Sequence, residues 1–278
     1  MPAIKKILFP VDFSDSSACA ARYVEALAGQ FEAEVMLLHV VNMGEHSLAE
    51  ELLPSRRELL EKFLVDELKY YTSQRVCVTG DTAEQIVATA RSWAPDLVAM
   101  PTHGLGAFRR MLLGSVTAKV LNDVECPVWT SVHLDTPKRL EDIHCKRILC
   151  ALDLTDRSLC VLEWAAWMAN QCGAQLAIAH ATPQLSGAYY GYGLEQEFAE
   201  SVAAQAFEKI DALQTGAGTD AQVFVDPGSP AAMIACAATR FDADLLILGR
   251  HSNSGLAGYL RPNAYFILRE SPCPAITI

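Results

Sequence analysis

The amino-acid sequence predicts an α/β protein made of two tandem doubly wound domains, each with a five-stranded parallel sheet. Short, almost wholly apolar segments alternate with segments that carry apolar residues at helical spacing. This alternation is typical of a parallel sheet that is covered by helices on both faces. The same series of segments starts again past the middle of the chain, and a length of 278 residues is about what two domains require.

Each element of the first half follows from its local pattern. Residues 4–11 are apolar and β-branched at the start, which predicts a strand, and Ser14 or Asp15 is placed to N-cap the helix that follows to about residue 31. Gly80 and Pro95-Asp96 mark the turns before later elements. The remaining expected elements are a strand over 34–41, a helix over about 55–71, a strand over 74–78, a helix over 82–93, a strand over 97–100, a helix from 114 to about 122 and a strand over 126–132.

The second half repeats the first in the same order. KRILCALDLTDRS at 146–158 matches KKILFPVDFSDSS at 5–17. Other matching pairs are Asp12 and Asp153, His39 and His180, Gly80 and Gly228, Asp96 and Asp244, and Cys126-Pro127 and Cys273-Pro274. The offset grows from 141 (153 − 12) to 148 (228 − 80), so the second copy carries an insertion after its second strand, for which residues 183–196 are the natural place. We expect a first domain over 1–133, a polar linker over 134–144 and a second domain over 145–278.

Composition narrows the class of protein. A net charge of -11 argues against a nucleic-acid-binding protein, because such proteins neutralise phosphates with Lys and Arg. The nine cysteines are scattered without a CxxC pair, which favours reduced thiols in a cytoplasmic protein and disfavours a zinc site. Neither a signal peptide nor an apolar run of about 18 residues is recognisable, so we expect no membrane association.

The loop after the strand over 97–100 has features of an anion site. It contains Pro101, Gly104 and Gly106, and after a basic, apolar run Gly114-Ser115 opens a helix. Glycines let backbone N–H groups approach an anion, and a helix N-terminus adds partial positive charge. The alternative is an ordinary strand–turn–helix connection. Asp12, Val40, Gly80 and Met100 also follow strands, and the carboxyl ends of parallel strands meet at one edge of a sheet, where ligands bind.

These residues together resemble the universal stress protein family. The strand that ends P-V-D-F-S, the strand that ends L-H-V, and the THG loop followed nine residues later by G-S carry the resemblance, which spans essentially the whole chain twice. The resemblance implies an adenine-nucleotide alpha-hydrolase-like fold of the tandem type. It further implies an intramolecular pseudo-dimer in which residues 128–132 pair with 275–278, and it allows a homodimer of the whole chain.

The same resemblance implies a nucleotide site in the first domain. It assigns Asp12 and Val40 to adenine, Met100 and Pro101 to the ribose, and the glycine loop with the following helix to the phosphates. The complete expected set is Pro10, Val11, Asp12, Val40, Met100, Pro101, His103, Gly104, Gly114, Ser115 and Val116. Simpler roles are available for some members: Asp12 as a helix cap, His103 as an exposed loop histidine.

Departures from the family pattern separate the two halves. Pro101 stands where the fingerprint has its first glycine, and the missing N–H costs on the order of 1.5–3 kcal/mol, or roughly tenfold to hundredfold in affinity, if a ligand uses that donor. The second half has Ala181 in place of the valine, Ser252 in place of the second glycine and Pro262-Asn263 in place of Gly-Ser. We therefore expect no triphosphate in the second domain.

Three functions are compatible with these residues. The first is a stress-response binding module that responds to ATP or AMP, with or without Mg²⁺, and acts on an unknown protein partner. The second is a slow ATP hydrolase, which ranks lower because the chain has no Gly-Lys-Ser/Thr phosphate loop, no obvious Mg²⁺ ligand and no assigned catalytic residue. The third is an interaction scaffold that binds no nucleotide.

Overall fold

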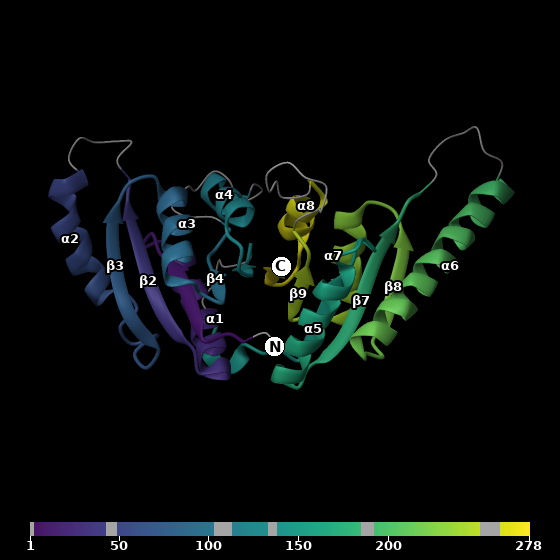
Figure 1. Cartoon of the computed structure of the whole chain (residues 1–278), viewed down its shortest axis with the longest axis horizontal. Coiled ribbons are helices and arrows are strands. Elements are labelled where there is room, and N and C mark those ends of the chain that lie inside the picture. The colour runs from purple at the N-terminus through teal and green to yellow at the C-terminus, as the bar shows by residue number, and fades with distance from the viewer. Residues whose placement is uncertain (1–2, 43–48, 103–112, 133–137, 185–191, 251–261) are drawn as a thin grey trace. The chain divides into compact units, whose positions relative to one another are not determined.

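The computed structural model describes residues 3–42, 49–102, 113–132, 138–184, 192–250 and 262–278. The chain divides into two compact units, residues 1–144 and 145–278. Figure 1 shows a twisted layer of strands with helices packed against it in each unit.

The first unit is a five-stranded parallel sheet in the order β3-β2-β1-β4-β5. Its elements are β1 (Lys6–Pro10), α1 (Asp15–Phe31), β2 (Glu34–Val41), α2 (Ala49–Lys62), β3 (Thr72–Thr79), α3 (Thr82–Trp93), β4 (Leu97–Ala99), α4 (Ser115–Asp123), β5 (Val128–Thr130) and the 3-10 turn η1 (Leu140–Asp142). The strand order reverses direction at β1, so the chain moves outward through β2 and β3 and then returns to β4. This reversal is the defining feature of a doubly wound sheet.

The second unit repeats this arrangement in the order β8-β7-β6-β9-β10, again with parallel neighbours. Its elements are β6 (Arg147–Ala151), α5 (Ser158–Cys172), β7 (Gln175–Thr182), α6 (Tyr192–Ala217), β8 (Gln222–Pro227), α7 (Pro230–Phe241), β9 (Leu245–Leu248), α8 (Pro262–Glu270) and β10 (Ala275–Thr277). Helices α5 and α6 pack together, as do α7 and α8. The predicted fold class and the tandem repeat are confirmed. The expected pairing of residues 128–132 with 275–278 stays a prediction.

The central strands form the core of each unit. Ile7, Leu8 and Phe9 of β1 have no exposed surface, and the same is true of all three residues of β4. Burial on both faces explains why these strands are continuously apolar rather than alternating. Ser14, one of the two expected caps, is the N-cap of α1, and its side chain accepts a hydrogen bond from Ser17 N at 3.2 Å.

The helix expected over residues 55–71 is placed differently in the structure. Helix α2 begins at Ala49 and ends at Lys62, so it both starts and ends earlier than expected. Beyond the helix, Leu64 takes a left-handed conformation with φ 56°, which no helix continues through. The guanidinium of Arg75 on β3 donates hydrogen bonds to the carbonyls of Leu60 and Phe63 and so occupies the helix end.

The insertion in the second copy lengthens a helix. Helix α6 has 26 residues whereas α2 has 14. The segment over 183–196 that the repeat alignment singled out includes the first turn of α6, and residues 185–191 of it lie outside the described part of the chain. The extra residues therefore extend the surface of the unit and leave the five-stranded sheet unchanged.

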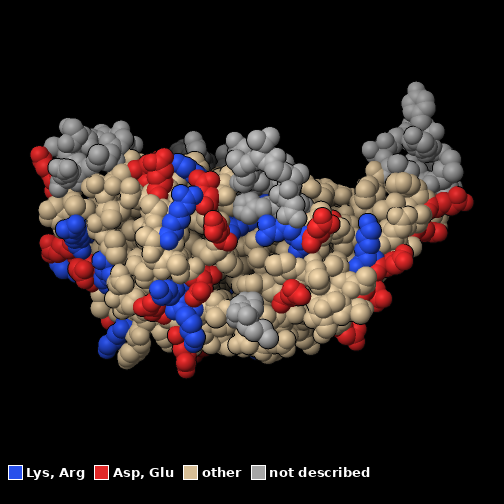
Figure 2. Space-filling model, viewed as in Figure 1, with Lys and Arg blue, Asp and Glu red and all other residues tan. Residues whose placement is uncertain are grey.

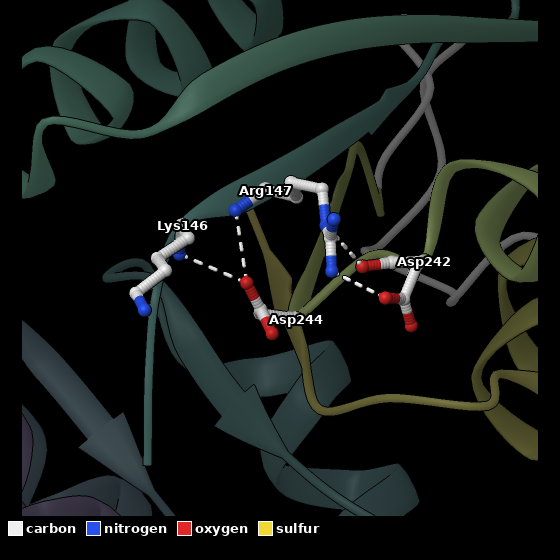
Figure 3. A network of polar contacts seen from close by, with 4 residues as sticks. All are labelled: Lys146, Arg147, Asp242 and Asp244. Atoms are coloured by element: carbon white, nitrogen blue, oxygen red, sulfur yellow. Dashed lines mark hydrogen bonds and ion pairs between the residues drawn. The ribbon is translucent and has the colours of Figure 1, made fainter. Parts of the chain in front are cut away.

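An aspartate at the start of one strand fixes the start of its neighbour in each unit. In Figure 3, Asp244 Oδ2 accepts hydrogen bonds from the backbone N–H groups of Lys146 and Arg147, both at 2.9 Å. The Arg147 side chain adds an ion pair with Asp242 and a 2.8 Å bond from Nε to the Asp242 carbonyl. In the first unit Asp96 binds two backbone N–H groups in the same way, since its Oδ2 accepts hydrogen bonds from Lys5 N at 2.7 Å and from Lys6 N at 2.9 Å.

The surface carries mixed charge. The face drawn in Figure 2 shows Lys and Arg side chains interspersed with Asp and Glu side chains. No helix within the described part of the chain combines the length and the apolar character that a bilayer crossing demands. All nine cysteines are free thiols.

Replacement of Asp244 by Ala is expected to lower the free energy of unfolding by about 1.5–3 kcal/mol, because two backbone N–H groups lose a charged acceptor. Denaturant titration followed by circular dichroism measures the change. Asp211→Ala is the matched control, since Asp211 is exposed on α6. Equal effects of the two substitutions would show that the contacts of Asp244 contribute nothing beyond the loss of a surface charge.

Candidate functional site

A crevice opens at the carboxyl ends of β1 and β4, where the strand order of the first unit reverses. Its volume is about 310 Å³. Four stretches of chain that are distant in sequence line it, together with α3. The lining residues are Pro10, Val11, Asp12, Ser17, Leu38, His39, Val40, Thr82, Ile86, Met100, Pro101, Thr102, Gly114, Ser115, Val116 and Thr117.

Two prolines keep β1 and β4 apart at this edge. The N–H group of Val11 donates to the carbonyl of Leu38 on β2 at 2.8 Å. Because the backbone N–H groups of successive residues in a strand point to opposite sides, the backbone of residue 10 faces β4. The N–H groups of Met100 and Thr102 point toward the β5 side, where they donate to the carbonyls of Trp129 at 3.0 Å and Ser131 at 3.2 Å. By the same alternation, the backbone of residue 101 faces β1. Pro10 and Pro101 stand at the two positions whose N–H groups would continue the β1–β4 ladder, and proline has no N–H.

The hydrogen-bonded ladder between β1 and β4 is shorter than the equivalent ladder between β6 and β9 in the second unit. In the first unit β1 and β4 pair at two positions, Ile7 with Leu97 and Leu8 with Val98. In the second unit β6 and β9 pair at four, and the last pair joins Ala151 to Leu248. Ala151 and Gly249 occupy the positions of the two prolines there. The prolines therefore shorten the ladder and open the crevice. The donor that Pro101 lacks is a sheet donor, which differs from the ligand contact considered from the sequence.

The Asp12 carboxylate organises the turn after β1. Its Oδ1 accepts hydrogen bonds from Ser14 N at 3.0 Å, from Ser17 Oγ at 2.8 Å and from the Ser14 hydroxyl. Phe13 between them has a left-handed backbone, φ 63°, and its ring packs 4.2 Å from the ring of His39, centroid to centroid. Asp12 therefore holds the turn and also lines the crevice, whereas the cap of α1 is Ser14, so the role of helix cap considered for Asp12 is wrong.

His39 is fixed in one tautomer at the floor of the crevice. Its Nδ1 lies 2.8 Å from the carbonyl oxygen of Val11, which can only accept, so Nδ1 carries the proton. Burial lowers the pKa of His39, although the bond to Val11 acts in the opposite direction. The imidazole is thus neutral at physiological pH. His180 makes the same 2.8 Å contact with the Leu152 carbonyl, and burial lowers its pKa as well.

The glycine loop is closed at its base. Gly114 N donates to the Thr102 carbonyl at 2.9 Å, and the hydroxyl of Thr117 lies 3.3 Å from the Pro101 carbonyl. A Cβ atom at position 114 would lie 3.0 Å from the Thr102 carbonyl oxygen, which explains the glycine. Helix α4 starts immediately afterwards without a side-chain cap, so the N–H groups of Ser115 and Val116 have no acceptor within the helix and lie at the crevice.

Nine of the eleven residues expected for the site line this crevice. They are Pro10, Val11, Asp12, Val40, Met100, Pro101, Gly114, Ser115 and Val116. His103 and Gly104 lie outside the described residues, as do Arg109 and Arg110. Sequence reasoning missed seven lining residues, which are Ser17, Leu38, His39, Thr82, Ile86, Thr102 and Thr117. The recurrence of Ser17 as Ser158 beside the matched aspartates was a signal that could have revealed it.

The second unit has a smaller crevice at the equivalent place, with a volume of about 210 Å³. Asp153 Oδ1 accepts hydrogen bonds from Thr155 N at 3.1 Å and Ser158 Oγ at 3.2 Å, which repeats the turn of the first unit. Its other lining residues include Arg157, Ala181, Gly249 and Asn263. The polar turn is thus kept in both units, whereas the helix start differs between them.

Comparison with known proteins agrees with this geometry. The profile of the Universal stress protein family matches residues 3–131 and again 144–278. The chain therefore belongs to the universal stress protein family and carries two of its domains in tandem.

Particular relatives show how far the similarity extends. Universal stress protein MJ0531 of Methanocaldococcus jannaschii is 35% identical over an alignment of 138 residues, and the match covers 45% of this chain and 79% of that protein. A universal stress protein structure from Archaeoglobus fulgidus DSM 4304 covers 98% of this chain and 95% of its own with a TM-score of 0.69 at 19% identity, a likeness of fold. A universal stress protein solved in complex with cAMP is 23% identical, covers 46% of this chain and 96% of its own, and has a TM-score of 0.37.

The free energy of unfolding is expected to fall as the pH drops below about 6.5, the ordinary pKa of histidine. Burial lowers the pKa values of His39 and His180, so the unfolded chain binds protons first and is favoured as the pH falls. Urea titrations between pH 8 and pH 5 measure this slope, and the double variant H39Q/H180Q should flatten it. An unchanged slope in the double variant would assign the effect to other groups.

Replacement of Pro101 by Gly is expected to extend the β1–β4 ladder, because the new N–H faces the Pro10 carbonyl. Amide hydrogen exchange should show protection at the introduced glycine, as at a strand position. Gly249, which already occupies the equivalent position in the second unit, provides the internal reference. Fast exchange at position 101 with protection at Gly249 would contradict the direction assigned to this donor.

Proposed function

We propose that the first unit binds an adenine nucleotide, ATP or AMP, in the crevice between β1 and β4, and that the protein acts in the cytoplasm as a stress-response binding module. The observation that carries this proposal is that residues distant in the sequence come together at one crevice. Nine residues from four separate stretches, 10–12, 40, 100–101 and 114–116, line one crevice at the switch point of the sheet. Switch points of doubly wound sheets are where such folds bind ligands.

The chemistry of the inner crevice suits a purine base. The Asp12 carboxylate is an acceptor for an exocyclic amino group, and the backbone groups of Val40 lie at the same edge. Ile86 of α3 and Met100 after β4 supply apolar walls against which a planar ring packs. Met100 and Pro101, which lie between this inner part and α4, are left for the ribose.

The outer crevice suits phosphate groups. The N–H groups of Ser115 and Val116 at the start of α4 provide donors, and the helix adds partial positive charge at that end. The Ser115 side chain is exposed, so its hydroxyl is available to a third phosphate oxygen. A nucleotide that is bound in this way places its base toward β1 and β2 and its phosphates toward α4.

The volumes of the two crevices also favour the first unit as the nucleotide-binding one. Pockets that hold small-molecule ligands span about 300–1,000 Å³. The first crevice is the larger of the two, at about 310 Å³ against about 210 Å³, which favours the first unit as the ligand site. We therefore assign the nucleotide to the first unit and a structural role, without a triphosphate, to the second.

Two alternative functions can be distinguished from this one by measurements of ATP binding and of phosphate release. A scaffold that has lost its ligand would bind no nucleotide at all. A slow ATP hydrolase would also need a way to hold Mg²⁺, and no group of three or more His, Cys, Asp and Glu side chains suited to a metal occurs among the residues that the structure describes. Phosphate release that exceeds that of Gly114→Asp would favour the hydrolase.

Substitution of Asp12 by Ala is expected to weaken ATP binding by roughly tenfold to hundredfold, because the amino group of the base loses a charged acceptor. Isothermal titration calorimetry with ATP and Mg²⁺ measures the affinity, and mass spectrometry of denatured protein tests for nucleotide that copurifies. Asp153→Ala is the matched control, because the same turn is removed from the second unit. Equal losses in the two variants, or no binding by the unaltered protein, would refute the assignment.

Substitution of Gly114 by Ala is expected to weaken ATP binding more than adenosine binding. The added Cβ would press on the Thr102 carbonyl oxygen at 3.0 Å and displace the start of α4, where the phosphates are proposed to lie. Competition titrations with ATP, AMP and adenosine measure the difference. Gly29→Ala is the control, because its Cβ would meet only the end of the Tyr71 side chain. Equal loss for all three ligands would place the phosphates elsewhere.

A further inference from the structure

Two cysteines meet at the amino-terminal edge of the second sheet. Cys145 lies two residues before β6, and Cys172 is the last residue of α5. Each thiol is the largest influence on the pKa of the other, and both side chains are partly exposed. This edge is the opposite end of β6 from the Asp153 turn, so the pair belongs to neither crevice.

Backbone contacts hold both cysteines in place. Asp244 binds the two N–H groups that follow Cys145, as Figure 3 shows. On the other side, Gly173 ends α5 in a left-handed conformation, φ 62°, and Gln175 N donates to the Lys146 carbonyl at 2.8 Å. Two fixed segments therefore bring residues 145 and 172 to the same edge of the sheet, where β6 and β7 begin side by side.

The internal repeat shows what this position ordinarily holds. Subtraction of the offset of 141 takes Cys145 to Ile4 and Cys172 to Phe31. Ile4 and Phe31 are buried apolar residues, 2% and 7% exposed. The first unit thus fills this place with apolar side chains, whereas the second places two thiols there and leaves both within reach of solvent.

We propose that Cys145 and Cys172 are a redox-active pair, which a hydroperoxide oxidises to a disulfide that thiols can reverse. Cys172 is the attacking group and Cys145 is the resolving group. This assignment is independent of nucleotide binding in the first unit.

The acid–base properties of the pair are consistent with these roles. The hydrogen bond from the Cys145 thiol lowers the pKa of Cys172, while the same bond and burial raise the pKa of Cys145. The carbonyl end of α5 disfavours a thiolate, so the bond from Cys145 is the feature that stabilises negative charge on Cys172. Since the thiolate is the reactive form, Cys172 reacts first.

The reaction balances with hydrogen peroxide as the oxidant. The Cys172 thiolate attacks one peroxide oxygen, a sulfur–oxygen bond forms, the oxygen–oxygen bond breaks and hydroxide leaves. The Cys145 sulfur then attacks the sulfenic sulfur, and the hydroxyl group leaves with the thiol proton as water. In total two thiols and one peroxide give one disulfide and two waters. The product links residues 145 and 172 and fixes the end of α5 to the start of β6.

Peptide mapping of the full chain tests the proposal. The reduced protein is treated with hydrogen peroxide, blocked with N-ethylmaleimide and digested. Mass spectrometry should then find the Cys145 peptide joined to the Cys172 peptide with the loss of two hydrogens, and dithiothreitol should separate them. In Cys145→Ser the sulfenic acid on Cys172 should persist and be trapped by dimedone. In Cys172→Ser, Cys145 should stay a thiol.

Several results would overturn the proposal. Cys160 and Cys236 are exposed lone thiols and serve as references for ordinary reactivity. Oxidation of these two while Cys145 and Cys172 remain open to N-ethylmaleimide would refute the pair. A link from Cys145 to the buried Cys273 would also refute it. The mapping uses the unaltered protein, so the test stands even where a cysteine variant folds poorly.

Discussion

The interruption of hydrogen bonding between β1 and β4 is the feature on which the candidate site depends. A parallel sheet normally continues its ladder to the ends of its strands, and the second unit does so as far as Ala151 and Leu248. In the first unit Pro10 and Pro101 lack the two N–H groups that the ladder would use next. The strands therefore separate at the carboxyl edge, beside Asp12 and the start of α4, and the opening that results is the crevice.

Comparison of the two units distinguishes structural features from those that vary with function. The aspartate that binds two N–H groups, the polar turn after the first strand and the histidine bonded to a strand carbonyl occur in both units at matching positions. These contacts satisfy backbone groups that every such domain must satisfy. The residues at the strand ends and at the start of the last helix differ, and these are the positions that surround the crevice.

Much of the fold could be predicted from the sequence because its signals are local. Apolar runs indicated the strands, and the repeated motifs indicated the tandem arrangement. Nine of the expected residues also line one crevice, because parallel strands bring their carboxyl ends to one edge. The bounds of α2 could not be predicted, because Arg75 on a later strand determines where that helix ends. Thr82, Ile86 and Thr117 were missed for a related reason. The packing of α3 and α4 on the sheet determines which side of each helix faces the crevice, and no sequence motif marks these residues.

The bond between Gly114 N and the Thr102 carbonyl has a further consequence. It joins Thr102 to Gly114 at 2.9 Å across the segment over 103–113, and so ties the start of α4 to the chain that leaves β4. Insertions, deletions or substitutions in that segment can accumulate without disturbing the sheet. A segment of different length or sequence can thus arise between Thr102 and Gly114 during evolution, or be grafted there by an engineer, with this backbone bond intact.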